Sequence, residues 1–211
     1  MTLHFRPMLR LLAVCSMAVG SLLPPSIGRA HDGHDHAAHM AAVAKGAPQY
    51  QRSMRSYAVP DVVLTNADGK AVRLRELLAT SDPVMLNFIF TTCGAICPVM
   101  SKVFSEVPVS LGQQASRLRL VSISIDPEND TPAKLKTYAG TFGAGAHWTF
   151  LTGQVEDVKA VQLAFDSYRG DKMSHEPLTL LHSAPDKPWV RIDGFASAKD
   201  LAQEYRKVVT R

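Results

Sequence analysis

From residue 84 onward, hydrophobic positions form short apolar runs that alternate with segments of helical periodicity. The clearest runs, residues 84–90 (VMLNFIF) and 118–125 (LRLVSISI), have the length of strands buried on both faces of a sheet. This alternation predicts an α/β fold with a central sheet. The other predicted strands cover residues 148–151, 178–181 and 189–192, and the predicted helices cover residues 98–114 (interrupted by Pro108), a segment from Pro132, 155–165 and 198–209.

Two further β-like runs precede this region and predict an N-terminal β-hairpin. They lie within residues 59–74 (VPDVVLTNADGKAVRL) and are joined by an Asn-Ala-Asp-Gly turn. Residues 75–78 then form a helical turn. We therefore place the folded domain at residues 57–211.

Residues 1–30 have the pattern of a secretory signal peptide. A short positive start with Arg6 and Arg10 precedes an apolar run over residues 11–19, and small residues precede a cut after Ala30. An uncleaved membrane anchor is the alternative, although the run is shorter than the roughly 20 apolar residues of a membrane span. We therefore expect an exported, periplasmic protein that meets a membrane only if this segment is retained.

Residues 31–56 follow as a His-rich tail and linker, which we expect to be flexible because it lacks a clear hydrophobic period. Neutral imidazoles chelate late transition metals, so weak metal capture is one interpretation, and a solvated polar leader is the other. The auxiliary metal-ligand candidates in this tail are His31, His34, His36, His39 and Met40.

Composition and charge narrow the class of partner. The chain has 46% hydrophobic and 20% charged residues, as an ordinary globular protein does. Its formal net charge of +4 includes three arginines and no acidic residue within residues 1–30, so the remainder is nearly neutral. No basic block remains in it, which argues against a nucleic-acid partner.

The candidate chemistry is concentrated after the first buried run. Once residues 1–30 are removed, the only cysteines are Cys93 and Cys97, and Pro98 follows at a predicted helix start. A helix N-terminus favours thiolates, which attack disulfides and also bind soft metals. The pair therefore predicts either a small-loop disulfide, structural or redox-active, or a metal site.

The residues around this pair resemble the Sco/SenC family. FTTCGAICPVMS resembles its F-T-x-C-x-x-x-C-P segment, and VSISIDPENDTPAKLKTYAGTFG looks like its second strand and D-P-x-x-D-T-P helix start. WTFLTGQVEDVKAVQLAF and LLHSAPDKPWVRIDGF are similar to its later segments. The resemblance covers residues 57–209 and implies a thioredoxin-like fold, with a central mixed β-sheet flanked by helices.

The resemblance also implies that Cys93, Cys97 and His182 bind copper. Two thiolates and one imidazole form a trigonal set suited to Cu(I), and the family implies Cu(II) as well. The sequence context of His182 alone fits a hydrogen-bonded loop histidine equally well. The family usually has Asp immediately before this histidine, where Leu181 stands here, and a carboxylate there would orient the ligand or balance its charge.

Two functional hypotheses use the same cysteines. The first is an exported metallochaperone that delivers copper to the binuclear copper site of cytochrome c oxidase or to another periplasmic copper protein. The second is a periplasmic thiol–disulfide reductase that keeps the acceptor cysteines reduced, with a thioredoxin-like protein as its own reductant. His182 and the tail favour the metallochaperone, because disulfide exchange needs neither.

Other polar residues fit structural roles. Asp126, Asp130 and Thr131 have the pattern of turn and helix-cap residues. Met173 and His175 lie on a predicted loop and either meet copper in transit or are solvated.

Overall fold

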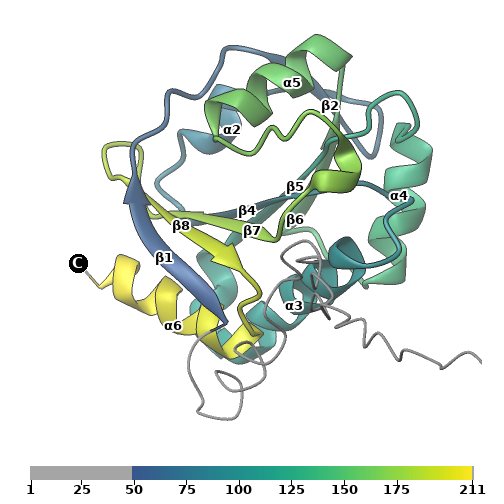
Figure 1. The fold of residues 1–211 in the computed structure, drawn as a ribbon. Helices are drawn as coiled ribbons and strands as arrows, with labels where there is room; N and C mark the ends of the chain where they lie inside the picture. Colours follow the sequence, from purple (N-terminus) through teal and green to yellow (C-terminus); the bar gives the residue numbers. More distant parts are fainter. Residues whose placement is uncertain (1–48, 211) are drawn as a thin grey trace, which may run out of the picture.

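The two long apolar runs form the centre of a β-sheet in the computed structural model, which describes residues 49–210 (Figure 1). Strands β4 (Val84–Ile89) and β5 (Arg119–Ser124) pair in parallel, and every residue of β4 is buried. Both faces of the sheet are covered, which is why both faces of these strands are apolar. The prediction of two buried strands is confirmed.

The sheet has eight strands and is mixed. The others are β1 (Tyr50–Arg55), β2 (Val63–Asn66), β3 (Ala71–Arg73), β6 (Trp148–Thr152), β7 (Leu178–His182) and β8 (Trp189–Gly194). Their order across the sheet is β1-β8-β7-β4-β5-β6-β2-β3. β6 is parallel to β5, whereas β7 is antiparallel to β4.

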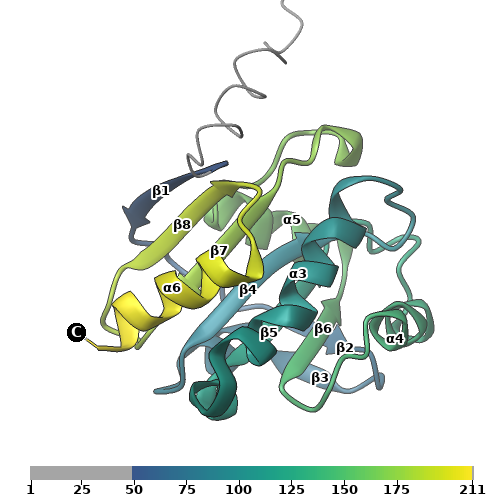
Figure 2. The same cartoon turned by 90° about the horizontal axis from the view of Figure 1, so that it is seen from below.

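The helices form a layer on each face. They are α2 (Leu74–Leu78), α3 (Ile96–Leu111), α4 (Pro132–Thr141), α5 (Val155–Ala164) and α6 (Ala198–Val209), with 3-10 helices η1 (Gly112–Arg117) and η2 (Lys172–Ser174). Helices α3, α4 and α6 pack on one face, and α2 and α5 on the other (Figure 1; Figure 2 views the α3 and α6 face). The predicted central sheet flanked by helices is confirmed.

Helix α3 differs from the prediction at both of its prolines. It begins at Ile96, so Pro98 is its third residue rather than its first. The backbone amides of a first helical turn have no partner within the helix, so proline costs little there. The helix also passes through Pro108 to Leu111. Pro108 lies in the last turn, where its missing N–H removes a single intrahelical bond.

The folded region begins before residue 57, so the predicted boundary of the linker at residue 56 is wrong. Strand β1 pairs with β8 along its whole length as an edge strand. Its residues are mostly polar and exposed, so no hydrophobic period marks it. An ion pair of 2.6 Å between Arg52 and the buried Glu204 ties β1 to α6.

The predicted hairpin is confirmed as β2 and β3, which are antiparallel. The side-chain oxygen of Asn66 accepts hydrogen bonds from the amides of Asp68 (3.0 Å) and Lys70 (2.9 Å), which closes the turn. Gly69 has a φ of 78°, the left-handed conformation that glycine adopts without strain.

The predicted signal peptide and the His-rich segment, residues 31–40, lie outside the described residues. Across residues 49–210, the helices are all too short or too polar to span a membrane.

Candidate metal centre

The cysteine pair lies where β4 gives way to α3. The amide of Cys93 donates to the carbonyl oxygen of Phe90 (3.2 Å), which turns the chain directly after the strand. The amide of Cys97 donates to the sulfur of Cys93 (3.3 Å). Both thiols are free; Cys97 is buried and Cys93 is partly exposed. Local backbone geometry therefore brings the two sulfurs to one end of the sheet.

The pKa values of the two thiols are shifted in opposite directions. Burial raises the pKa of Cys93, but hydrogen bonds from the backbone amides of Cys97, Ala95 and Ile96 and from the Cys97 side chain outweigh it, so the pKa is lower than that of a free thiol. Burial, followed by the hydrogen bond to Cys93, raises the pKa of Cys97. The helix start therefore favours the thiolate at Cys93 alone, and the prediction of two thiolates is corrected.

The D-P-x-x-D-T-P segment holds the cysteine loop in place through hydrogen bonds. Asp130 is fully buried and accepts hydrogen bonds from the amide (3.0 Å) and the hydroxyl (2.5 Å) of Thr91. The hydroxyl of Ser124 donates to the same carboxylate (2.6 Å). Thr131 caps α4 as predicted, by accepting from the amide of Lys134. Asp130 thus does more than form a turn, because it holds the residue two positions before Cys93.

His182 does not lie with the cysteines. It is paired with Val84, the first residue of β4, whereas the cysteines follow the last residue of that strand. The length of β4, about 17 Å at ~3.3 Å per residue, separates the two ends. The sequence places His182 after a strand, but β7 is antiparallel to β4, so the end of β7 lies beside the start of β4. The predicted set of Cys93, Cys97 and His182 is not brought together by the fold.

The surroundings of His182 explain its burial without a metal. Its ring stacks on Trp189, with centroids 4.3 Å apart and planes 4° from parallel. Its Nε2 atom lies 3.1 Å from the carbonyl oxygen of Lys187. Burial lowers the pKa of His182, against hydrogen bonds with the backbone of Lys187 and Leu78. These contacts are those of a structural histidine.

His175 lies at the cysteine end of the sheet. Its Nε2 atom lies 3.0 Å from the carbonyl oxygen of Phe88, near the end of β4. Burial lowers the pKa of His175, which favours the neutral imidazole that metals bind. The direction of β7 explains why His175 lies here. Because β7 is antiparallel to β4, the loop before β7 lies at the end of β4 that leads into the cysteine loop. The local sequence pattern does not indicate this direction.

Cys93, Cys97 and His175 are not close enough in this structure to share one metal ion. Among residues 49–210, no three His, Cys, Asp or Glu side chains are close enough to hold a metal ion together. The thiol, thiolate and imidazole donors suit Cu(I) in number and in softness. Binding by all three requires His175 and the cysteine loop to come closer together. The Nε2 atom of His175 can keep its contact with the Phe88 carbonyl while Nδ1 binds the metal, because the second ring nitrogen of a metal-bound histidine usually contacts a backbone carbonyl or carboxylate.

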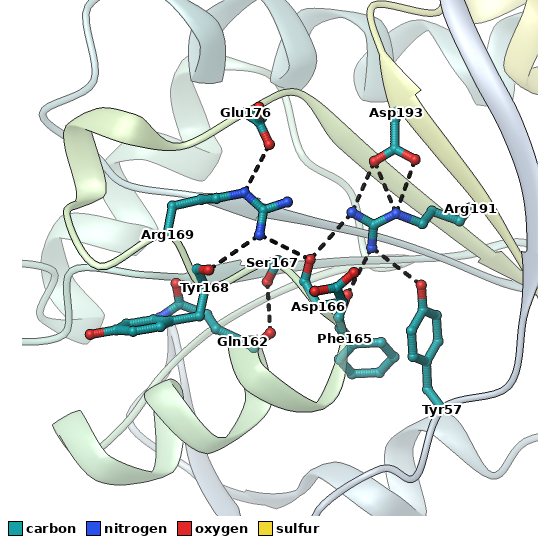
Figure 3. Close-up of polar contacts among 10 residues, drawn as sticks. All are labelled: Tyr57, Gln162, Phe165, Asp166, Ser167, Tyr168, Arg169, Glu176, Arg191 and Asp193. Carbon is teal, nitrogen blue, oxygen red and sulfur yellow. Dashed lines mark hydrogen bonds and ion pairs between the residues drawn. The ribbon is translucent and has the colours of Figure 1, made fainter.

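Two arginines anchor the loop between α5 and β7 (Figure 3). The buried Arg191 of β8 donates to the carbonyl oxygens of Phe165 (2.8 Å) and Asp166 (3.3 Å), where the loop leaves α5. Arg169 donates to the same Asp166 carbonyl (3.2 Å) and pairs with Glu176 (2.8 Å), the neighbour of His175. The position of His175 is thus tied to the sheet through side chains that the sequence did not single out. Their irregular spacing carries no motif.

The chain resembles known proteins over nearly all of its described residues. The SCO1/SenC family model matches residues 51–210. A SCO1 protein homolog of Bacillus subtilis is 36% identical over 99 residues, which cover 46% of this chain and 50% of the relative. The matches to curated relatives span half of their length or less.

Solved structures agree with the family match. ScoI of Bradyrhizobium japonicum, solved with copper bound, is 27% identical and has a TM-score of 0.58, covering 71% of this chain and 99% of its own. BsSco, described as a member of the Sco family of cytochrome c oxidase assembly proteins with a disulfide switch, is 27% identical with a TM-score of 0.62, covering 75% and 96%. The family match over residues 51–210, together with the shared fold, places this chain in the SCO1/SenC family.

Proposed function

We propose that this chain binds copper through Cys93, Cys97 and His175 and carries it to a copper-accepting protein. The observation that carries the proposal is the shared position of these residues, because His175 contacts β4 at the end that leads into the cysteine loop. A relative of the same fold binds copper in its solved structure. His182 is not part of the proposed site.

Each of the three donors has a different role in copper binding. The partly exposed thiolate of Cys93 meets the ion first, because its sulfur is deprotonated more readily and is reached from solvent. Cys97 then closes the site and releases a proton to solvent as its sulfur binds. His175 supplies a neutral nitrogen, and two thiolates with one imidazole complete a three-coordinate Cu(I) site.

The acceptor and the compartment complete the proposal. A related protein belongs to cytochrome c oxidase assembly, so the binuclear copper site of that oxidase, or a related periplasmic copper protein, is the proposed acceptor. Residues 1–30 are proposed to export the chain and to be removed after Ala30. Copper is then cargo that the mature protein collects and releases.

The His-rich tail is proposed as an auxiliary capture segment. Its imidazoles and thioether bind copper more weakly than a dithiolate does, and tethering raises the local copper concentration beside the site. The candidate ligands are His31, His34, His36, His39 and Met40.

A second function, thiol–disulfide reduction, is favoured by the unequal acidities of the cysteines. The thiolate of Cys93 attacks an acceptor disulfide and forms a mixed disulfide. Cys97 then loses its proton and attacks the Cys93 sulfur, which releases the acceptor as a dithiol and leaves a Cys93–Cys97 disulfide. A thioredoxin-like dithiol is the proposed reductant that restores the pair.

A competition titration tests copper binding. Reduced mature protein is titrated with Cu(I) against a chromogenic chelator, alongside the single variants Cys93→Ser and Cys97→Ser. We expect wild type to retain one equivalent and each variant to lose it, since one thiolate and one imidazole retain Cu(I) poorly. Retention at wild-type affinity by either variant contradicts the proposed site. Normal disulfide exchange by a protein that retains no copper supports the reductase instead.

A further inference from the structure

Sulfur side chains at the cysteine end of the sheet become more exposed from the core outward. Cys97 is fully buried, Cys93 is partly exposed, and Met173 is 74% exposed on η2. The yellow-green turn that contains η2 and the start of α3 lie at the same end of the molecule in both views (Figures 1 and 2). Sulfur donors are therefore present at this end of the molecule both in the core and at the surface.

The turn that carries Met173 is fixed on both sides. The ammonium group of Lys172 forms an ion pair of 2.6 Å with the buried carboxylate of Asp126. The amide of Met173 donates to the side chain of Asp171 (2.8 Å). On the other side, His175 lies 3.0 Å from a carbonyl oxygen of β4. The backbone thus presents Met173 at a set position, while its side chain extends into solvent.

Packing does not account for this methionine, because most of its side chain is exposed. Its surroundings do suit a soft cation. The neighbouring Lys172 is neutralised by Asp126 and lies 5.8 Å from the centroid of the Phe90 ring, so Met173 does not stand beside an unpaired positive charge. A thioether is a neutral, soft donor that binds Cu(I) and releases it more readily than a thiolate does.

We propose that Met173 is a transfer ligand, which takes Cu(I) as it leaves the cysteine pair and presents it to the acceptor. The inference rests on the proposed copper-carrying function and adds the exit step. The bond from copper to the sulfur of Cys97 breaks while a bond to the sulfur of Met173 forms. Copper stays Cu(I), and the released thiolate takes one proton from solvent. Cys97 leaves first because it is the deepest donor and the acceptor approaches from outside.

The test separates the rate of transfer from the affinity for copper. Mature protein is loaded with one equivalent of Cu(I) without oxygen and mixed in a stopped-flow instrument with excess bathocuproine disulfonate, which colours on binding Cu(I). The variants are Met173→Leu, which keeps the apolar surface without sulfur, and Met173→Ala, which removes both. Met54→Leu is the matched control, because Met54 is 43% exposed on the edge strand β1.

We expect both Met173 variants to transfer Cu(I) about tenfold more slowly, with equilibrium affinity unchanged and Met54→Leu at the wild-type rate. A Met173→Leu variant as fast as wild type overturns the inference while leaving the proposed function intact. A slow Met173→Ala beside a normal Met173→Leu also overturns it, since an apolar contact then explains the effect. Failure of wild type itself to retain Cu(I) overturns the proposed function together with the transfer step.

Discussion

The two ends of the central sheet each hold a buried histidine, and only His175 lies at the end that leads into the cysteine loop. His175 is 7% exposed and His182 is 5% exposed, and each has a ring nitrogen near a backbone carbonyl oxygen. Burial and hydrogen bonding therefore do not distinguish them. What differs is the neighbourhood, since His175 lies near the cysteine loop whereas His182 stacks on Trp189. The proposal of His175 as a copper ligand therefore rests on the donors at the same end of the sheet.

The opposite end has a pocket of its own. His182, Trp189, Tyr57 and Lys187 contribute to the lining of a pocket of about 430 Å³. The aromatic side chains there build the core on the α2 and α5 face of the sheet, where Trp189 also contacts Phe165 at 5.2 Å between centroids. The aromatic side chains at this end pack against one another, and no cysteine or methionine lines the pocket.

Replacing each histidine with alanine in turn gives the sharpest test of this comparison. His175→Ala is expected to lower copper affinity by about a hundredfold and to abolish the thiolate-to-copper absorption of a Cu(II) adduct. His182→Ala is expected to leave copper affinity unchanged and to lower the free energy of unfolding by about 2–4 kcal/mol, because it opens a cavity against Trp189. Chelator competition and urea unfolding measure the two effects. A loss of copper affinity in His182→Ala with normal affinity in His175→Ala would reverse the assignment.

The position of a histidine in the fold is harder to predict from the sequence than the elements around it. The buried strands, the hairpin and helix α6 follow from local patterns, and the structure has them where the sequence predicts. The position of His182 depends on the direction of β7 relative to β4, which no local pattern encodes. The strand β1 was missed for a related reason, because it is an edge strand held by backbone pairing and by Arg52 rather than by an apolar face.

The cysteine end itself contains a second contrast, between two thiols four residues apart. We expect iodoacetamide to label Cys93 at least about tenfold faster than Cys97 at neutral pH, since the thiolate reacts and Cys97 is buried. In the Cys97→Ser variant, the labelling rate of Cys93 should rise below the pH of about 8.5 at which a free cysteine titrates, because its pKa is lowered.

The Cys93→Ser variant provides the converse measurement. Labelling of Cys97 should rise only above that pH, because its pKa is raised. Mass spectrometry of the labelled peptides reports both rates across pH. Equal rates and equal pH profiles would contradict the assignment of Cys93 as the attacking sulfur.

Loosening the loop at the cysteine end should have a smaller effect. Arg169→Ala removes the pairing with Glu176 and one tie to Asp166, and we expect copper affinity to fall about threefold, as suits an exposed ion pair of less than about 1 kcal/mol. Arg117→Ala is the matched control, because its ion pair with Asp82 (3.2 Å) lies before the start of β4, at the other end. Equal copper affinities for the two variants would show that Arg169 does not position His175.

The smallest expected effect on the core site comes from removing the His-rich segment, residues 31–40. Deleting residues 31–40 should remove weaker copper equivalents and slow loading at limiting copper, since a tethered ligand raises the local copper concentration. Those equivalents should fade as pH falls through about 6.5, where imidazoles protonate and repel the metal. The affinity of the dithiolate site should stay unchanged, because the deletion touches none of its donors. A copper titration and a stopped-flow loading curve on the mature and truncated chains measure both quantities, and identical stoichiometry with identical loading rates would make the tail a solvated leader.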